Sequence, residues 1–509
     1  MTAPADLVLT DAAVHTLAEP DRTHEAVAVR DGRIVRVGDA YDLDMLVGAD
    51  TRRVALDGRV VLPGFVDAHT HLPVVGRREV HADLGGATSR EAALDALRDR
   101  AAEVDPDEWV LGYGYDESAW GETAYLTGND LDAVHEGPVA AFREDLHAVS
   151  VNAAALDRLD LPDEGVERAD GTPTGVLVEA AATAVREQLR PDRAEARRLV
   201  AAGQAVAHAR GVTAVHDMVR GPAAPRAYRD LERAGELTLR VQLYYWRDHL
   251  DAVEEVGLAT GAGDRVRFGG IKTFSDGSIG ARTARLADPY ADAPDERGEW
   301  VVDPDALGAL VDRVDDLDLR PAVHAIGDDA VDAALDAFAA ADEPGADRYR
   351  VEHAELADDA AVERMADLGV VASVQPNFLK WAGEGGLYEA RLGDRRTRSN
   401  RLRDLLDAGV PLAFGSDCMP LDPLFGVHHA VNAPEPAQRL DVTEALRAYT
   451  RGAAYAGFDE DRMGTVEPGR LGDLVVLDDS PWGRPESIRD VDVAMTVVGG
   501  EVVYDALDD

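Results

Sequence analysis

Short apolar runs recur along the sequence between residues 210 and 416. They have the length and near-continuous apolar character of strands buried on both faces. Segments with helical spacing of apolar residues separate most of them, for example 304–317, 328–340 and 358–368. This alternation predicts parallel strands joined by helices. The predicted strands are 212–216, 239–245, 266–274, 321–324, 350–353, 370–374 and 411–416.

A further buried strand is predicted earlier in the chain, over residues 60–72 (VVLPGFVDAHTHL). With it, eight strands alternate with helices, which is the pattern of an α/β fold of the (β/α)8 TIM-barrel type. Residues 73–205 mix helical stretches, such as 89–104, with an aromatic run broken by glycines at 109–120. We therefore expect 73–205 to be a long insertion after the first barrel strand.

The two ends of the chain also have the pattern of strands and turns. Residues 26–29 and 34–37 flank an Asp31-Gly32 turn and predict a hairpin. Strands at both ends need partners, so we expect the ends to build one small composite β-sandwich domain together. The predicted domains are 1–58 and 461–509 for this β-sandwich and 59–460 for the barrel.

The amino-acid composition favours a saline environment and argues against one class of partner. The chain has 97 acidic and 52 basic residues, a net charge of −45, and its only lysines are Lys272 and Lys380. A surface rich in carboxylates and almost free of lysine resembles the proteins of extreme halophiles, so we expect higher activity in molar KCl than in dilute buffer. The same charge repels phosphate backbones and argues against nucleic-acid partners.

Other compositional features suggest a cytoplasmic protein. Cys418 is the only cysteine, which excludes an intrachain disulfide. The N-terminal residues lack the pattern of a signal peptide, and no apolar run approaches the roughly 20 residues of a membrane span. We therefore expect no membrane partner and a small-molecule substrate, with a homo-oligomer left open.

Imidazole and carboxylate side chains recur where the predicted strands end. In a barrel of this type, the carboxyl ends of the strands build the active site. His69 and His71 lie at i and i+2 of one strand and can therefore face one cation. Imidazole and carboxylate suit zinc and its neighbours among the divalent metals, so we expect a metal centre. The candidate ligands are His69, His71, Lys272, His324, His353 and Asp417.

Each candidate also has a structural interpretation when taken alone. His324 or His353 could be a hydrogen-bonded core histidine, Asp417 a helix cap, and Lys272 a surface charge. Lys272 nevertheless stands out, because a chain that otherwise uses arginine keeps a lysine at a strand tip. Unlike a guanidinium, a lysine amine can lose its proton and combine with carbon dioxide to form an anionic carbamate.

The ordered motifs VDAHTHL, IKTFSDGS, HAIGD, VEHA, GSD and GRLGDLVVLD resemble the amidohydrolase superfamily over nearly the whole chain. The resemblance is strongest to the YtcJ-like branch, which includes N-substituted formamide deformylase. It implies that His69 and His71 hold one metal with Asp417 and that His324 and His353 hold a second. Carboxylated Lys272 would bridge the two ions, with Glu179 as the alternative bridge or as a pocket contact.

The insertion resembles that branch as well. GYGYDESAW at 112–120 is similar to its Gly-rich aromatic motif, so Trp120, together with Tyr115, is a candidate for lining the pocket unless the pair is plain core. His147 falls in DLHAVSVN, which is similar to a motif usually written Asp-Gly-His, and is a candidate for substrate contact. Leu146 replaces that glycine, which puts a close backbone approach to substrate in doubt.

These features predict an amidohydrolase that cleaves a non-peptide C–N bond, such as an amide or formamide, through a metal-activated hydroxide. Asp417 would be the general base and acid. We expect two zinc ions, with manganese, iron or cobalt possible. The alternatives are a single-metal, deaminase-like hydrolase, a non-catalytic ligand-binding barrel and a metal-independent isomerase, the last made improbable by the four histidines.

Overall fold

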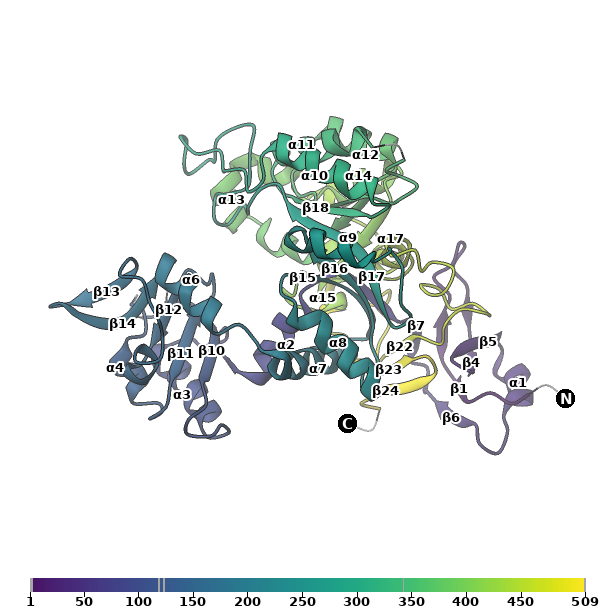
Figure 1. Cartoon of the computed structure of the whole chain (residues 1–509). Helices are drawn as coiled ribbons and strands as arrows, with labels where there is room; N and C mark the ends of the chain where they lie inside the picture. The colour runs from purple at the N-terminus through teal and green to yellow at the C-terminus, as the bar shows by residue number, and fades with distance from the viewer. Residues whose placement is uncertain (1–2, 118–119, 122–123, 342, 508–509) are drawn as a thin grey trace. The chain divides into compact units, whose positions relative to one another are not determined.

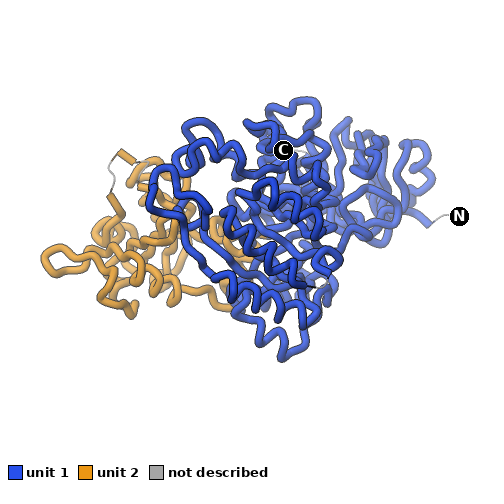
Figure 2. The backbone as a smooth tube through the Cα atoms, turned by 90° about the horizontal axis from the view of Figure 1, so that it is seen from above, with its two compact units in different colours: residues 1–72, 204–509 blue, residues 73–203 orange. Residues whose placement is uncertain are grey.

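The computed structural model describes residues 3–117, 120–121, 124–341 and 343–507. The chain divides into two compact units, which Figure 2 colours separately. The first unit comprises Met1–Leu72 and Gln204–Asp509, and the second comprises Pro73–Gly203. The second unit therefore corresponds to the segment predicted as an insertion.

The first unit contains a parallel sheet of eight strands, part of which is labelled in Figure 1. Each strand pairs with its neighbour in chain order, so the sheet follows the (β/α)8 topology that the sequence predicted. The strands are β8 (Phe65–Thr70), β15 (Val212–Val219), β16 (Arg240–Trp246), β17 (Val266–Phe274), β18 (Pro321–Ala325), β19 (Arg350–His353), β20 (Val371–Val374) and β21 (Leu412–Phe414).

Helices connect these strands, and their ends carry local sequence signals. Asp303 caps one helix by accepting the N–H of Ala306 at 3.0 Å, and Gly369 ends another in the left-handed region at φ 66°. The α-helices from residue 193 onward are α7 (Arg193–Ala209, which begins in the second unit), α8 (Ala223–Ala234), α9 (Leu250–Val256), α10 (Pro304–Asp316), α11 (Asp328–Ala339), α12 (Asp359–Leu368), α13 (Leu387–Leu392), α14 (Leu402–Asp407), α15 (Pro423–Val431), α16 (Val442–Arg447) and α17 (Ala453–Ala456).

The prediction of a single strand over residues 60–72 is wrong. The segment forms two strands, β7 (Val60–Pro63) and β8, separated by Gly64. A Cβ atom on Gly64 would lie 2.3 Å from Cγ2 of Thr213, so glycine allows the backbone to pass close to β15. β8 ends at Thr70, and His71 lies between it and helix α2 (Leu72–Val80).

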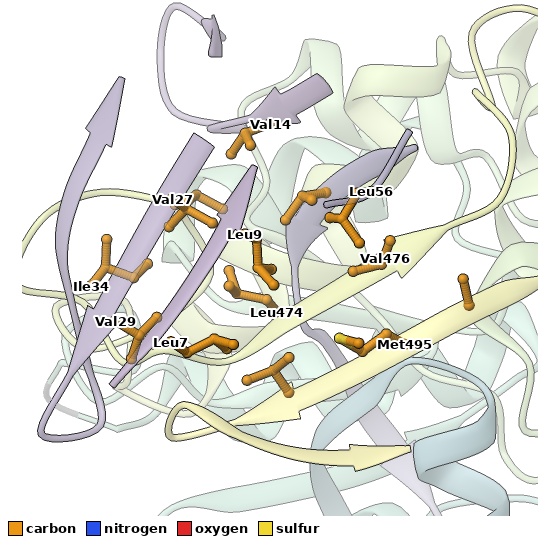
Figure 3. Close-up of a cluster of buried hydrophobic side chains, with 14 residues drawn as sticks. Leu7, Leu9, Val14, Val27, Val29, Ile34, Leu56, Leu474, Val476 and Met495 are labelled. Atoms are coloured by element: carbon orange, nitrogen blue, oxygen red, sulfur yellow. The ribbon is translucent and has the colours of Figure 1, made fainter. Parts of the chain in front are cut away.

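β7 belongs to the composite β-sandwich that the sequence predicted. It pairs antiparallel with β22 (Leu474–Leu477), which joins the two ends of the chain in one sheet. Leu7, Val27, Val476 and Met495 lie in the common core (Figure 3). The other strands are β1 (Leu7–Thr10), β4 (Ala26–Arg30), β5 (Arg33–Gly38) and β6 (Arg52–Ala55) in one sheet and β2 (Ala13–His15), β3 (Thr23–His24), β23 (Val493–Val498) and β24 (Glu501–Asp505) in the other; α1 (Ala40–Leu43) follows β5.

The second unit is built on a sheet of six strands with its own apolar core. Its strands are β9 (Ala82–Asp83), β10 (Val110–Tyr115), β11 (Val139–Arg143), β12 (Ala148–Val151), β13 (Val166–Ala169) and β14 (Thr172–Val178). Its helices include α3 (Arg90–Ala101), α4 (Gly128–Asp132), α5 (Ala153–Leu156) and α6 (Glu179–Gln188). Across the described residues, no helix combines the length and apolar character that crossing a bilayer requires.

Candidate metal centre

Three of the predicted ligands converge where β8 and β21 end. Nε2 of His71 lies 3.3 Å from Oδ1 of Asp417, and Nε2 of His69 lies 3.9 Å from the same oxygen. The three candidate ligand atoms all lie within 4.8 Å of one another. Two imidazole nitrogens and a carboxylate oxygen at this separation can share one divalent cation, so the donor set fits such an ion.

The second nitrogen of each imidazole is held by the protein. Nδ1–H of His69 donates to Oε2 of Glu352 at 2.6 Å, and Nδ1–H of His71 donates to the carbonyl oxygen of Met218 at 2.8 Å. These bonds fix the tautomer and leave both Nε2 lone pairs facing Asp417. Metal-binding histidines in proteins are commonly anchored in this way.

Glu352 is itself held by a buried arginine. Nε of Arg350 lies 2.7 Å from Oε1 of Glu352, and Nη2 of Arg350 donates to the carbonyl of Ala68 at 2.6 Å and to Oγ of Ser373 at 2.8 Å. Burial raises the pKa of Glu352, but the charges of Arg350 and Lys272 and the hydrogen bond from Ser373, acting together, outweigh it and keep the pKa of the carboxyl below its ordinary value.

Arg350 and Glu352 were not among the predicted site residues, although the sequence carries a signal for them. The two charged residues lie at i and i+2 of the strand RVEH, where every residue is buried, so both point to one face of a sheet that excludes water. A buried ion pair in a barrel strand is costly unless it is paired and hydrogen-bonded, which marks it as a candidate for function.

His324, His353 and Lys272 form a second group beside the first. The ring centroid of His353 lies 4.9 Å from that of His69 and 4.4 Å from that of His324. Among the described residues, neither Nδ1 of His353 nor Nζ of Lys272 has a hydrogen-bond partner, although both atoms are buried. Unpaired buried donors and acceptors are unfavourable, and a bound cation and a carbamate would satisfy them.

Burial also sets the protonation of this second group. It lowers the pKa of His324 to about 3 and that of Lys272 to about 8, and it lowers the pKa of His353 well below its ordinary range. The imidazoles are therefore neutral at pH 7, as ligation requires. Nε2–H of His324 donates to the carbonyl of Gly277 at 2.9 Å, and its ring stacks on Phe274 at 4.1 Å.

The loop that carries Asp417 is tied back to β8. Oδ1 of Asp67 accepts the N–H of Ser416 at 3.0 Å and the N–H of His69 at 3.1 Å. Asp417 N–H donates to the carbonyl of His69 at 2.7 Å. Asp417 adopts φ 50° and His353 adopts φ 72°, a conformation that non-glycine residues rarely occupy and that is concentrated at functional sites.

The candidate substrate contacts from the insertion lie in the second unit. Nδ1 of His147 is 3.2 Å from Oε2 of Glu179, and both side chains are exposed. Trp120 is 6% exposed, packs in the core of this unit and donates its indole N–H to the carbonyl of Ala87 at 2.9 Å. Residues 118–119 of its motif lie outside the described residues. The roles of His147, Glu179 and Trp120 in substrate binding stay predictions.

Leu146 occupies a backbone conformation that suits glycine. Its φ is 62°, so the backbone keeps the left-handed conformation that glycine adopts without steric cost. A leucine at this position therefore carries a steric cost that glycine would avoid. The apolar side chain packs in a core cluster of the second unit, which offsets part of that cost.

Comparisons with known proteins agree with this architecture. The sequence model of the amidohydrolase family matches residues 52–504. The chain is 32% identical to Bacillus subtilis YtcJ, an amidohydrolase by name, over 96% of this chain and 97% of the other. It is 29% identical to the N-substituted formamide deformylase of Arthrobacter pascens over 99% of each chain. The crystal structure of a metal-dependent hydrolase from Pyrococcus furiosus superposes with a TM-score of 0.81 at 31% identity, covering 94% of this chain and 99% of that one.

Proposed function

Because this chain belongs to the amidohydrolase family, we propose that it is a metal-dependent hydrolase that cleaves a non-peptide C–N bond of the amide or formamide type. The observation that carries the proposal is the convergence of His69, His71 and Asp417, with both imidazoles oriented by hydrogen bonds on their far nitrogens. The similarity to a formamide deformylase supports the choice of bond.

We assign the metal ligands as the motifs implied. His69, His71 and Asp417 would hold one ion, and His324 and His353 would hold a second. Lys272, after carboxylation, would bridge them. Its lowered pKa supports this role, because a larger fraction of the amine is neutral near pH 7 and can combine with carbon dioxide. Zinc suits these ligands best, and manganese, iron and cobalt are alternatives.

Divalent cations in such a site supply Lewis acidity, which lowers the pKa of a water nucleophile and polarises the substrate carbonyl. Asp417 accepts the proton that the water loses as its oxygen attacks the carbonyl carbon. The same carboxyl then donates that proton to the nitrogen as the C–N bond breaks, so the products are a carboxylic acid and an amine. Glu352 keeps His69 in the required tautomer throughout.

A substrate screen tests this proposal. The purified protein would be reconstituted with zinc, manganese or cobalt in molar KCl and incubated with N-formyl and N-acyl amines, and the released amine would be measured. We expect hydrolysis of at least one N-formyl or N-acyl class that EDTA abolishes and added metal restores. Metal-loaded, folded protein that releases no amine from any of these compounds would overturn the proposed bond class.

A single-metal mechanism is the second candidate, and one observation favours it. Within the described part of the chain, His69, His71 and Asp417 are the one group of three or more His, Cys, Asp or Glu residues whose ligand atoms come close enough for a shared ion. In that case Lys272 would orient substrate instead of bridging. Metal analysis of the reconstituted protein separates the two: about two ions per chain supports the bridge, and about one supports the single-metal site.

A further inference from the structure

A short 3-10 helix, η4 (Pro376–Trp381), follows β20 and faces the loop that carries Asp417. In a 3-10 helix the side chains at i and i+3 are eclipsed, so Asn377 and Lys380 share one face. Nδ2 of Asn377 donates to the carbonyl of Ser416 at 2.8 Å and to the carbonyl of Met419 at 3.0 Å. Nζ of Lys380 donates to the same Met419 carbonyl at 2.8 Å.

The loop held in this way is conformationally unfavourable. Asp417 and Cys418 adopt φ values of 50° and 53°, so two consecutive non-glycine residues are left-handed. A left-handed non-glycine residue is strained and persists only where the surroundings impose it. The two carbonyls that bracket this pair, those of Ser416 and Met419, are the groups that η4 binds.

The two donors differ in exposure, and each has a distinct physical role. Asn377 is fully buried, so its hydrogen bonds are made away from water, where losing a partner costs most. Lys380 is exposed and lies 4.4 Å over the ring of Trp381, which restricts where its ammonium can go. It is also one of only two lysines in the chain, and the other is Lys272 in the candidate metal centre.

We propose that Asn377 and Lys380 form a clasp that positions the Asp417 carboxylate for both metal binding and proton transfer. Neither residue touches the reacting atoms, so both are positioning residues. Phe378, on the same short helix, stacks parallel to His353 at 6.1 Å, so η4 also supports a ligand of the second group. The proton-transfer part rests on the proposed function, whereas the metal-binding part does not.

Two single variants test the clasp. Asn377→Asp keeps the side-chain size but replaces the donor with an acceptor that faces two carbonyl oxygens. Lys380→Met keeps the apolar stem and removes the ammonium; because Lys380 is exposed, we expect this variant to fold even if the first does not. Matched controls are Gln438→Glu, at a buried amide that donates to Ser399 O at 2.7 Å, and Arg439→Met, at a cation that donates to Ala433 O at 2.7 Å.

The first measurement is independent of activity. Competition between each variant and a chelator gives the dissociation constant of Co²⁺, and the visible spectrum of the bound ion reports its coordination. We expect the constant to rise at least tenfold in Lys380→Met and further in Asn377→Asp, with a changed spectrum. The controls should stay within twofold of the wild type.

The second measurement is kinetic, at saturating metal and well below the melting temperature. We expect kcat to fall at least tenfold in each clasp variant while KM changes less than threefold. The double variant should lose less than the product of the single losses, because both donors bind the same Met419 carbonyl. A lowered melting temperature with unchanged Co²⁺ affinity and kcat would show a merely structural role and overturn the clasp.

The measurements distinguish a failure of the proposed function from a failure of the clasp. If the wild type hydrolyses none of the screened compounds, the proposed function is lost, but the Co²⁺ measurements still decide whether the clasp exists. If the wild type is active and both clasp variants match their controls in Co²⁺ affinity and in kcat, the clasp is lost and the proposed function stands.

Discussion

The orientation of each imidazole at the metal centre is decided by a partner far away in the sequence. Nδ1 of His69 is bonded to Glu352, and Nδ1 of His71 is bonded to a carbonyl on β15. Because a neutral imidazole has one donor and one acceptor, the anchor on one nitrogen determines which nitrogen can accept a cation. The chemistry at this scale therefore depends as much on the anchors as on the ligands.

A substitution of Asp417 can separate its role in metal binding from its role in proton transfer. Asp417→Asn keeps an oxygen that can face the cation but has no carboxylate to accept a proton. We expect metal content close to that of the wild type and a fall in turnover of about 10²- to 10⁴-fold, the usual contribution of a general acid and base. Metal analysis and a steady-state assay check this, and substantial hydrolysis by the variant would refute the assignment.

Glu352→Gln tests the buried anchor. The change removes the anion that faces both His69 and Arg350, and it leaves Arg350 as a buried charge without its carboxylate partner. We expect metal affinity to fall about 10- to 100-fold and stability to fall by about 3–5 kcal/mol. Chelator competition and denaturant unfolding measure the two effects.

A surface glutamate provides the control for that substitution. Glu254 pairs with Arg313 where both side chains are about half exposed, so Glu254→Gln should change stability by less than about 1 kcal/mol. Metal affinity equal to that of the wild type in Glu352→Gln would show that the anchor does not act on His69.

His208 should make stability depend on pH. It is buried, its Nδ1–H donates to Val212 O at 3.1 Å, its Nε2 accepts from the Thr238 hydroxyl at 2.8 Å, and burial lowers its pKa to about 4. In the unfolded chain His208 has its ordinary pKa near 6.5, so on acidification the unfolded chain binds the proton before the folded chain does. The stability that neutral His208 contributes is therefore complete above pH 6.5 and is lost as the pH falls toward 4. The loss at pH 5 is about 2 kcal/mol.

Replacing His208 isolates that contribution. The difference in unfolding free energy between pH 7 and pH 5 should be about 2 kcal/mol smaller in His208→Gln than in the wild type, because glutamine does not titrate. Equal pH dependence in the two proteins would contradict the assignment. Denaturant titrations at both pH values and fixed salt provide the comparison.

At the scale of elements, the barrel was predictable because its signals are local. Buried parallel strands give continuous apolar runs, and residues such as Asp358 and Gly369 mark where α12 begins and ends, so the strands lie close to their predicted positions. The break at Gly64 was not predictable from the run itself, since the apolar pattern of β7 continues into β8. It is set by Thr213, about 150 positions away.

The metal centre could be predicted only in part, because some of its contacts are made by residues that are distant in the sequence. Strand-tip histidines and Asp417 follow from where strands end, and the structure brings His69, His71 and Asp417 together. The contacts of Glu352 with His69 and of Asn377 with the loop that carries Asp417 depend on which strands and loops lie opposite them. That information is tertiary, so no local pattern selects Asn377, whereas a charged residue inside a fully buried strand was a local signal for Glu352.

The junction between β7 and β8 gives a prediction at this scale. Gly64→Ala would place a Cβ 2.3 Å from Cγ2 and 2.4 Å from Oγ1 of buried Thr213, a stiff β-branched side chain. We expect a loss of about 1–3 kcal/mol from overpacking. Gly308→Ala is the control: it lies within α10 with open space around its Cβ position, so alanine should add about 0.5–1 kcal/mol. Thermal or denaturant unfolding checks both signs: stability equal to or above that of the wild type in Gly64→Ala would contradict the overpacking, and a loss in Gly308→Ala would contradict the control.

At the scale of the whole molecule, the property that bears most on salt dependence is the net charge of −45. Self-repulsion of this size opposes the compact state, and molar salt reduces the screening length to about 3 Å. We therefore expect both the melting temperature and the activity to rise from dilute buffer to molar KCl. Equal thermal midpoints in the two conditions would contradict this, and a titration of KCl at fixed pH makes the measurement.

The β-sandwich has a consequence for synthesis on the ribosome. Val61 on β7 pairs with Val476 on β22, so the first strands to emerge must wait for partners more than four hundred positions later. At about 5–20 residues per second, that delay is roughly 20 to 80 s. During it, the apolar faces that later meet in Figure 3 have nothing to cover them, which makes the nascent chain a natural client for chaperones.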